Sequence, residues 1–92
     1  MELTDLTKAQ QKQLKMQAHA LKPVVSIGNK GLTDAVINEL EIAFKAHGLI
    51  KVKIASDKAG RAIIYDEIVN KLCVHGIQMI GQMGVFYYPD NA

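Results

Sequence analysis

A single compact α/β domain, with elements in the order α-β-α-β-α-β-β, is the fold that the amino-acid sequence predicts. Helical and extended hydrophobic patterns alternate along most of the chain, and two adjacent β-prone segments follow them. A chain of 92 residues is long enough to bury one hydrophobic core and too short for two. We therefore expect one domain over residues 1–92, built on a four-stranded mixed sheet with packed helices.

The first helix and the first strand are separated by a proline. Thr7 and Gln10 have the spacing of a capping box, which predicts a helix that runs to about Leu21. Pro23 ends this helix, because its ring disfavours the helical conformation in the residue before it. The apolar run Pro23–Ile27 stops at a glycine and predicts a buried strand.

A second helix and a second strand follow. Thr33 is a favourable N-cap, and the helix that it begins should continue to Gly48. Its apolar face consists of Val36, Ile37, Leu40, Ala43 and Phe44. From residue 49 the pattern changes to period two, which predicts a strand over Leu49–Ile54 with Lys51 and Lys53 on its wet face.

The last third of the sequence predicts a helix and a hairpin. Ile64, Ile68 and Leu72 repeat at helical spacing up to Gly76, which should end the third helix. The polar connection before it is expected at Ser56–Gly60, the two strands at Ile77–Ile80 and Val85–Tyr88, the turn at Gly81–Gly84 and a frayed end at residues 89–92.

Composition and charge exclude several classes of protein. The net charge of +2, from 11 Lys and Arg against 9 Asp and Glu, does not by itself indicate an anionic partner. Cys73 is the single cysteine, so an intramolecular disulfide or a zinc-binding cysteine pair is excluded. No apolar run is long enough for a membrane span, and the first residues do not resemble a secretory signal. We expect a cytoplasmic protein that does not bind membranes.

The segment Gly28-Asn29-Lys30-Gly31 lies between a predicted strand and a predicted helix, where free amide groups and the helix dipole favour an anion. Glycine lets a phosphate approach the backbone closely, and Lys30 adds a flexible charge. The alternative is that the two glycines simply form a tight turn. Gly81–Gly84 has the same glycine spacing, but it lies between predicted strands and carries no charge, so a hairpin turn explains it.

Basic residues are concentrated in the first third of the chain. Lys8, Lys12 and Lys15 fall at i, i+4 and i+7 and so share one stripe of the first helix, and Lys22 follows that stripe. The stripe favours an anionic partner, although a solvated helix face is the alternative. The acidic residues Asp34, Glu39, Glu41, Asp66 and Glu67 fall on the other two helices. We therefore expect a polarised surface, with its positive side on the first helix, Lys22 and Lys30.

Residues of the sheet can add to this surface. Lys51 and Lys53 either extend the positive side or only keep one face of the sheet wet. Tyr87 and Tyr88 point to opposite faces of the last strand, so at most one of them can stack on a base. Because the chain contains no Trp, base stacking should be a minor contribution to binding.

No arrangement of residues indicates catalysis. In nucleotide-hydrolysing phosphate loops a lysine follows the last glycine directly, whereas Leu32 follows Gly31 here. His19, His47 and His75 are isolated, and the last two lie beside glycines that should end helices, where they cap carbonyl groups or face solvent. We expect no enzyme, no cofactor, no metal site and no small-molecule substrate.

The segments Leu21–Thr33 (LKPVVSIGNKGLT) and Leu49–Ile54 (LIKVKI) resemble the CRM domain in its single-domain bacterial YhbY form. A closing pattern I-G-x-x-x-V-x-Y supports the resemblance, which covers nearly the whole chain. It implies a fold similar to the C-terminal domain of bacterial translation initiation factor three. It also implies that the glycine loop binds RNA, and that the partner is ribosomal RNA or a pre-ribosomal particle of the large subunit.

The family's RNA-binding loop corresponds to Gly28–Gly31, and its basic neighbour corresponds to Lys22. Two positions depart from the family pattern. A basic residue often follows the hairpin glycine, and an arginine often follows the strand tyrosine, where this chain has Gln82 and Tyr88. We therefore expect RNA binding mainly through the first helix and the loop, and a monomeric protein.

A second hypothesis is a protein-protein adaptor that binds a ribosomal protein through apolar surface. Ile42 and Ala46, on the outer arc of the second helix, favour it. High salt separates the two hypotheses, because an apolar contact persists in salt and a phosphate contact does not.

Overall fold

The computed structural model describes residues 5–89, and its elements follow the predicted order. They are α1 (Lys8–Ala18), β1 (Pro23–Ile27), α2 (Asp34–His47), β2 (Leu49–Ile54), α3 (Lys58–Leu72), β3 (His75–Ile80) and β4 (Met83–Tyr87). Most of the end that we expected to fray, residues 90–92, lies outside the described residues. None of the helices within residues 5–89 combines the length and the apolar character that crossing a membrane requires.

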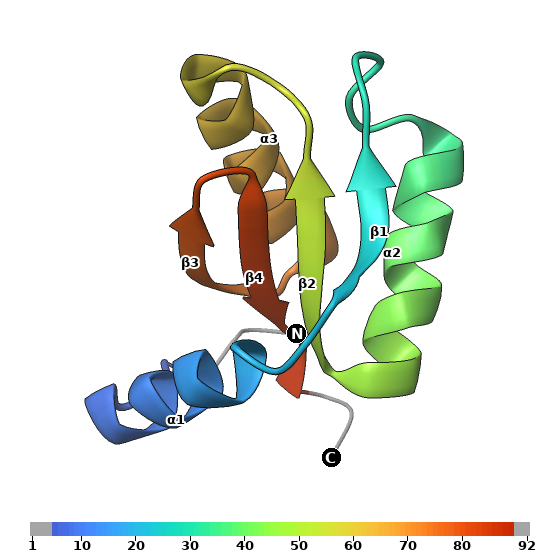
Figure 1. The fold of residues 1–92 in the computed structure, drawn as a ribbon. Coiled ribbons are helices and arrows are strands. Elements are labelled where there is room, and N and C mark those ends of the chain that lie inside the picture. The colour runs from blue at the N-terminus through green and yellow to red at the C-terminus, as the bar shows by residue number, and fades with distance from the viewer. Residues whose placement is uncertain (1–4, 90–92) are drawn as a thin grey trace.

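The four strands form one mixed sheet in the order β1-β2-β4-β3 (Figure 1). β1 and β2 are parallel because α2 crosses over between them, whereas β4 is antiparallel to both of its neighbours. In the parallel pair, Ile27 lies opposite Ile54, so both strands end at the same edge of the sheet. The predicted four-stranded mixed sheet is confirmed.

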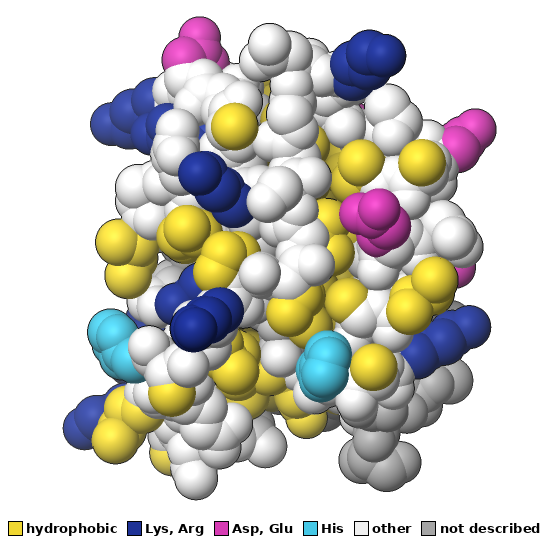
Figure 2. Space-filling model, turned by 45° about the vertical axis from the view of Figure 1, so that its right-hand side comes forward, with side chains coloured by type: hydrophobic (Ala, Val, Ile, Leu, Met, Phe, Trp, Pro, Cys, Tyr) yellow, Lys and Arg dark blue, Asp and Glu magenta, His cyan; other side chains and the backbone are white. Residues whose placement is uncertain are grey.

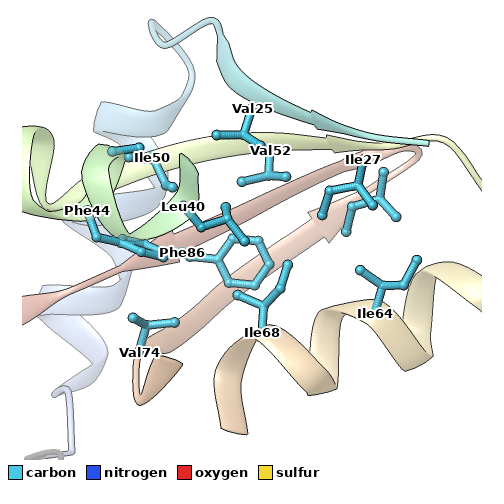
Figure 3. Packing of buried hydrophobic residues seen from close by; sticks show 12 residues of the cluster. Val25, Ile27, Leu40, Phe44, Ile50, Val52, Ile64, Ile68, Val74 and Phe86 are labelled. Atoms are coloured by element: carbon cyan, nitrogen blue, oxygen red, sulfur yellow. The ribbon is translucent and has the colours of Figure 1, made fainter. Parts of the chain in front are cut away.

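One face of the sheet packs against α2 and α3 and forms the hydrophobic core. The core contains Val25, Ile27, Leu40, Ala43, Phe44, Ile50, Val52, Ile54, Ile64, Ile68, Val74 and Phe86. Figure 3 shows Phe86 of β4 between the sheet and Ile68 of α3, and both side chains are 0% exposed. Three of the four strands supply side chains to this layer at alternate positions, which is the pattern of a sheet with one buried face.

Helix α1 lies on the opposite face, which we call the open face of the sheet. Its N-terminus has the predicted capping box, in which Thr7 Oγ1 accepts from the Gln10 amide at 3.1 Å and Gln10 Oε1 accepts from the Thr7 amide at 2.8 Å. Ala18, 1% exposed, packs against the sheet near Val85. Figure 1 shows that α1 crosses the end of the sheet where β1 begins, and that no other helix of residues 5–89 lies on this face.

Three helix boundaries differ from the predictions. α1 ends at Ala18, before the expected Leu21. α3 begins at Lys58, inside the expected polar connection, because the Asp57 side chain accepts a hydrogen bond from the Gly60 amide at 2.7 Å and so caps the helix. At its other end, α3 stops at Leu72 rather than at Gly76, since the next residue adopts a left-handed conformation with φ 52°.

The hairpin turn is shorter than predicted. β3 ends at Ile80 and β4 begins at Met83, so the loop contains only Gly81 and Gln82. Gly81 has φ +56°, which suits the first position of a two-residue hairpin loop. Gly84 belongs to β4, where it pairs with Val52 and Met79, and the side chains of Met79 and Phe86 fill the space where a Cβ atom would lie.

Candidate nucleic-acid interface

The loop Gly28–Gly31 projects beyond the edge of the sheet between β1 and α2 (Figure 1). Gly28, Asn29 and Lys30 are exposed, and the Gly31 amide closes the turn by donating to the Gly28 carbonyl at 3.1 Å. Within residues 5–89, no hydrogen bond reaches the amides of Asn29 and Lys30. The loop therefore presents free backbone donors beside the N-terminus of α2, where the helix dipole favours an anion.

The structure explains the presence of glycine at only one of the two glycine positions of this loop. Gly31 has φ +68°, a conformation that costs other residues energy, so the turn itself explains this glycine. Gly28 has no positive φ, and a Cβ atom at either position would meet nothing within 4 Å. Neither the backbone nor the packing requires glycine at position 28. The tight-turn alternative thus accounts for Gly31 and leaves Gly28 unexplained.

Lys51 and Lys53 lie on the open face in rows that cross the sheet. In the row nearest the loop, Lys53 lies opposite Ser26 of β1 on one side and Met83 of β4 on the other. In the next row, Lys51 lies opposite Val85. Both lysines therefore belong to one face, and Lys53 lies at the end of that face from which the glycine loop projects.

The structure does not bring the lysines of α1 together with the loop. Lys8, Lys12 and Lys15 are exposed on α1, and Lys22 precedes β1, so all four lie toward the end of the sheet at which β1 begins (Figure 1). The loop follows the other end of β1. Lys51 and Lys53 occupy the open face between these two sites, so the ten predicted residues form an extended surface rather than one compact patch.

Acidic side chains are segregated from this surface. Within residues 5–89 they are Asp5, Asp34, Glu39, Glu41, Asp57, Asp66 and Glu67. Neither α1 nor any of the four strands contains one of them. Figure 2 shows most of the visible acidic side chains on its right-hand half, whereas basic side chains are visible on both halves. Within residues 5–89 the strands and α1 therefore carry no acidic side chain, whereas α2 and α3 carry both acidic and basic ones.

Two cations at the loop end of the sheet were not among the predicted site residues. Lys58 and Arg61 begin α3, directly after the β2 end that lies beside β1. The Arg61 Nη1 atom donates to the Ser56 carbonyl at 2.8 Å, which holds the guanidinium close to the start of the helix. Their spacing of three residues at a helix start was a visible signal, but the sequence analysis placed Lys58 in a polar connection.

Tyr87, which ends β4, and Tyr88, which follows it, lie on opposite faces, as predicted. Tyr88 contacts Phe44 on the helical face, with the ring centroids 6.2 Å apart. Tyr87 lies near α1 and stacks on His75 with 6.4 Å between the centroids. His75 is a residue of β3, so the prediction that it caps a helix or faces solvent beside one is wrong. Residues 5–89 contain no cluster of His, Cys, Asp or Glu side chains suited to a metal ion.

Comparisons with known proteins show the family to which the chain belongs. The model of the CRS1/YhbY (CRM) domain matches residues 6–88. The chain belongs to this family. It is 41% identical over 90 residues to an RNA-binding protein of Haemophilus influenzae, covering 97% of this chain and 91% of the relative. It is also 41% identical over 83 residues to a protein of Pseudomonas aeruginosa named a probable RNA-binding protein, covering 89% and 80% of the two chains.

A solved structure of this fold comes from Staphylococcus aureus. It is the solution structure of a hypothetical protein for which RNA binding is suggested, with a TM-score of 0.79 and 25% identity to this chain. The match covers 90% of this chain and 88% of the other. The α/β fold of this CRM domain is therefore shared with proteins whose names refer to RNA.

Proposed function

We propose that this CRM domain binds RNA by holding the phosphate backbone in the loop Gly28–Gly31. The observation that carries the proposal is Gly28, whose glycine is required by neither conformation nor packing and leaves open space beside free amides. A phosphate oxygen can approach such a backbone closely and accept its hydrogen bonds. Lys30, exposed in the same loop, neutralises part of the phosphate charge.

The RNA then continues across the open face of the sheet. Lys53 and Lys51 contact successive phosphates, and the lysine stripe of α1 contacts the strand where it leaves the sheet. The absence of acidic residues from α1 and the strands supports this path. Because phosphate contacts position RNA without reading its sequence, recognition is mainly by shape.

The cellular target is ribosomal RNA in precursors of the large subunit, where the protein acts as a monomeric assembly factor without catalytic activity. The CRM family membership and the RNA-binding names of its relatives support this part of the proposal. Sequencing of RNA crosslinked to the protein in cells tests it. Crosslinks spread evenly over messenger RNA, with no enrichment in large-subunit RNA, would contradict it.

RNA binding itself is tested by the change Gly28→Asp, which places a negative charge in the open space of the loop. The variant should lose at least tenfold in affinity for RNA and keep the melting temperature of the parent, since no atom lies within 4 Å of the new Cβ. Gly28→Asn is the matched control, because it has a similar size and no charge. If about four lysines each neutralise one phosphate, log Kd should change with log salt with a slope of order 3.

An adaptor function has one supporting observation, since Ile42 of α2 is 60% exposed on the acidic side of the molecule. If the protein stayed on ribosomal particles in high salt, and Ile42→Ala released it, the adaptor function would replace the RNA-binding one.

A further inference from the structure

A pocket of about 240 Å³ lies between the end of α1 and the open face of the sheet. Its lining consists of Ala18, His19, Lys51, Gln78, Ile80, Met83 and Val85. Val85 and Ala18, which are 2% and 1% exposed, close it on the inside. The pocket therefore has an apolar base and lies between elements, α1 and the strands, that contain no acidic residue.

The walls of this pocket combine apolar surface with a free polar group. Ile80 lies opposite Met83 in the hairpin, and although it lines the pocket it remains 59% exposed. Gln78 lies opposite Val85 in the adjacent row. Within residues 5–89, the Gln78 side chain makes no hydrogen bond, so its amide has both a donor and an acceptor to offer.

Two lysines and a histidine lie at or beside the opening. Lys51 belongs to the pocket, and Lys53 lies opposite Met83 at the edge nearer to the glycine loop. His19 follows Lys15 by four residues at the end of α1, so it lies on the same helix stripe as the lysines. A ligand that carries negative charge next to a flat apolar group would satisfy both parts of this site.

The size of the pocket limits its occupant. Pockets that hold whole drug-sized ligands have volumes of roughly 300–1,000 Å³. This one is smaller, so it has room for a single planar group while the rest of the ligand remains outside. Unstacked bases of single-stranded RNA are bound in this manner, with the base against side chains and its edge hydrogen-bonded.

We propose that this pocket binds one unstacked RNA base, with Ile80 and Met83 against its flat face and Gln78 hydrogen-bonded to its edge. The proposal rests on the RNA-binding function and adds a base contact to the phosphate contacts. Adenine is the expected base, since a side-chain amide pairs with its neighbouring donor and acceptor.

The test compares the affinities of an oligoadenylate of about eight nucleotides and of an abasic ribose-phosphate oligomer with the same number of phosphates. Ile80→Ala should weaken binding of the oligoadenylate about fivefold and leave binding of the abasic oligomer unchanged. Ile63→Ala is the matched control, because Ile63 of α3 is 60% exposed and lies outside the pocket. It should change neither affinity.

Gln78→Ala supplies a second measurement. It should remove the preference of the parent for oligoadenylate over oligouridylate, while the fivefold effect of Ile80→Ala stays constant as salt is raised. If Ile80→Ala binds both oligomers like the parent, the pocket does not hold a base. A loss of binding in Gly28→Asp would then leave the loop proposal standing. Should the parent bind neither oligomer, both proposals fall.

Discussion

The amide of Ala55 donates a hydrogen bond of 2.9 Å to the carbonyl of Ile27, directly before the glycine loop. This bond joins the ends of two parallel strands whose last side chains are buried in the core. The base of the loop is thus fixed by the sheet, while its tip makes few contacts within the described residues. Substitutions at the tip should therefore separate binding from folding.

Replacing each of the two loop glycines by alanine should change the free energy of unfolding by different amounts. Gly31→Ala should lower the free energy of unfolding by about 1 kcal/mol, because φ +68° is unfavourable for a residue with a Cβ atom. Gly28→Ala should change it by less than about 0.5 kcal/mol. Urea denaturation of both variants measures this difference, and equal losses would contradict the assigned backbone conformations.

The charge of Lys53 should be visible in the salt dependence of RNA binding. Lys53→Ala should reduce the slope of log Kd against log salt by about 1, because one fewer phosphate is neutralised. Lys71→Ala is the control, since Lys71 of α3 is paired with Glu67 at 3.7 Å on the acidic side. A titration of RNA at several salt concentrations provides the slopes. The same slope for Lys53→Ala and the parent would remove Lys53 from the interface.

Gly76 should not tolerate a larger residue, because the Tyr65 ring fills the space where its Cβ atom would lie. The ring cannot move away freely, since it packs against Phe86 with 4.9 Å between the centroids. Gly76→Ala should therefore cost about 1–3 kcal/mol, as overpacked sites do. In a double-mutant cycle, Gly76→Ala should lower the free energy of unfolding clearly less in the Tyr65→Ala variant than in the parent. Additive costs would show that the two residues do not compete for space.

Alkaline pH should destabilise the protein partly through Tyr65. Burial of the hydroxyl, together with the nearby Asp66 carboxylate, raises the pKa of Tyr65 above its ordinary 10.0. The unfolded chain then loses this proton more readily than the folded one. The contribution of the protonated Tyr65 hydroxyl to the free energy of unfolding is therefore fully present below pH 10 and is lost as pH rises through the folded-state pKa. Urea midpoints at increasing pH should fall less steeply for Tyr65→Phe than for the parent. Parallel curves would contradict the raised pKa.

The sequence predicted those elements whose apolar pattern is bordered by proline or glycine. β1 and β2 have the predicted bounds, because a proline or a glycine borders each apolar run. The start of α3 was missed because Asp57 and Gly60 resemble a polar loop until their capping bond is seen. The start of β4 was missed because Gly84 resembles a turn residue and is explained only by the side chains over it. Tertiary contacts decided both places.

The candidate site was predictable to a similar extent. The position of the loop at a strand end and before a capped helix follows from local sequence, and the structure agrees. How α1 lies on the sheet does not follow from local sequence. The sequence could not show that the lysines of α1 lie at the far end of β1 from Lys30. Nor could it show the pocket beside Gln78, which exists only because α1 crosses the open face.

The concentration of most acidic residues of the described chain on or beside α2 and α3 has a kinetic consequence. A molecule with a net charge of only +2 is attracted weakly to a polyanion at long range, but its separated charges form an electric dipole. In the field of an RNA, this dipole experiences a torque that turns the cationic face inward before the surfaces touch. Productive collisions then become more frequent, so added salt should slow association more than it speeds dissociation.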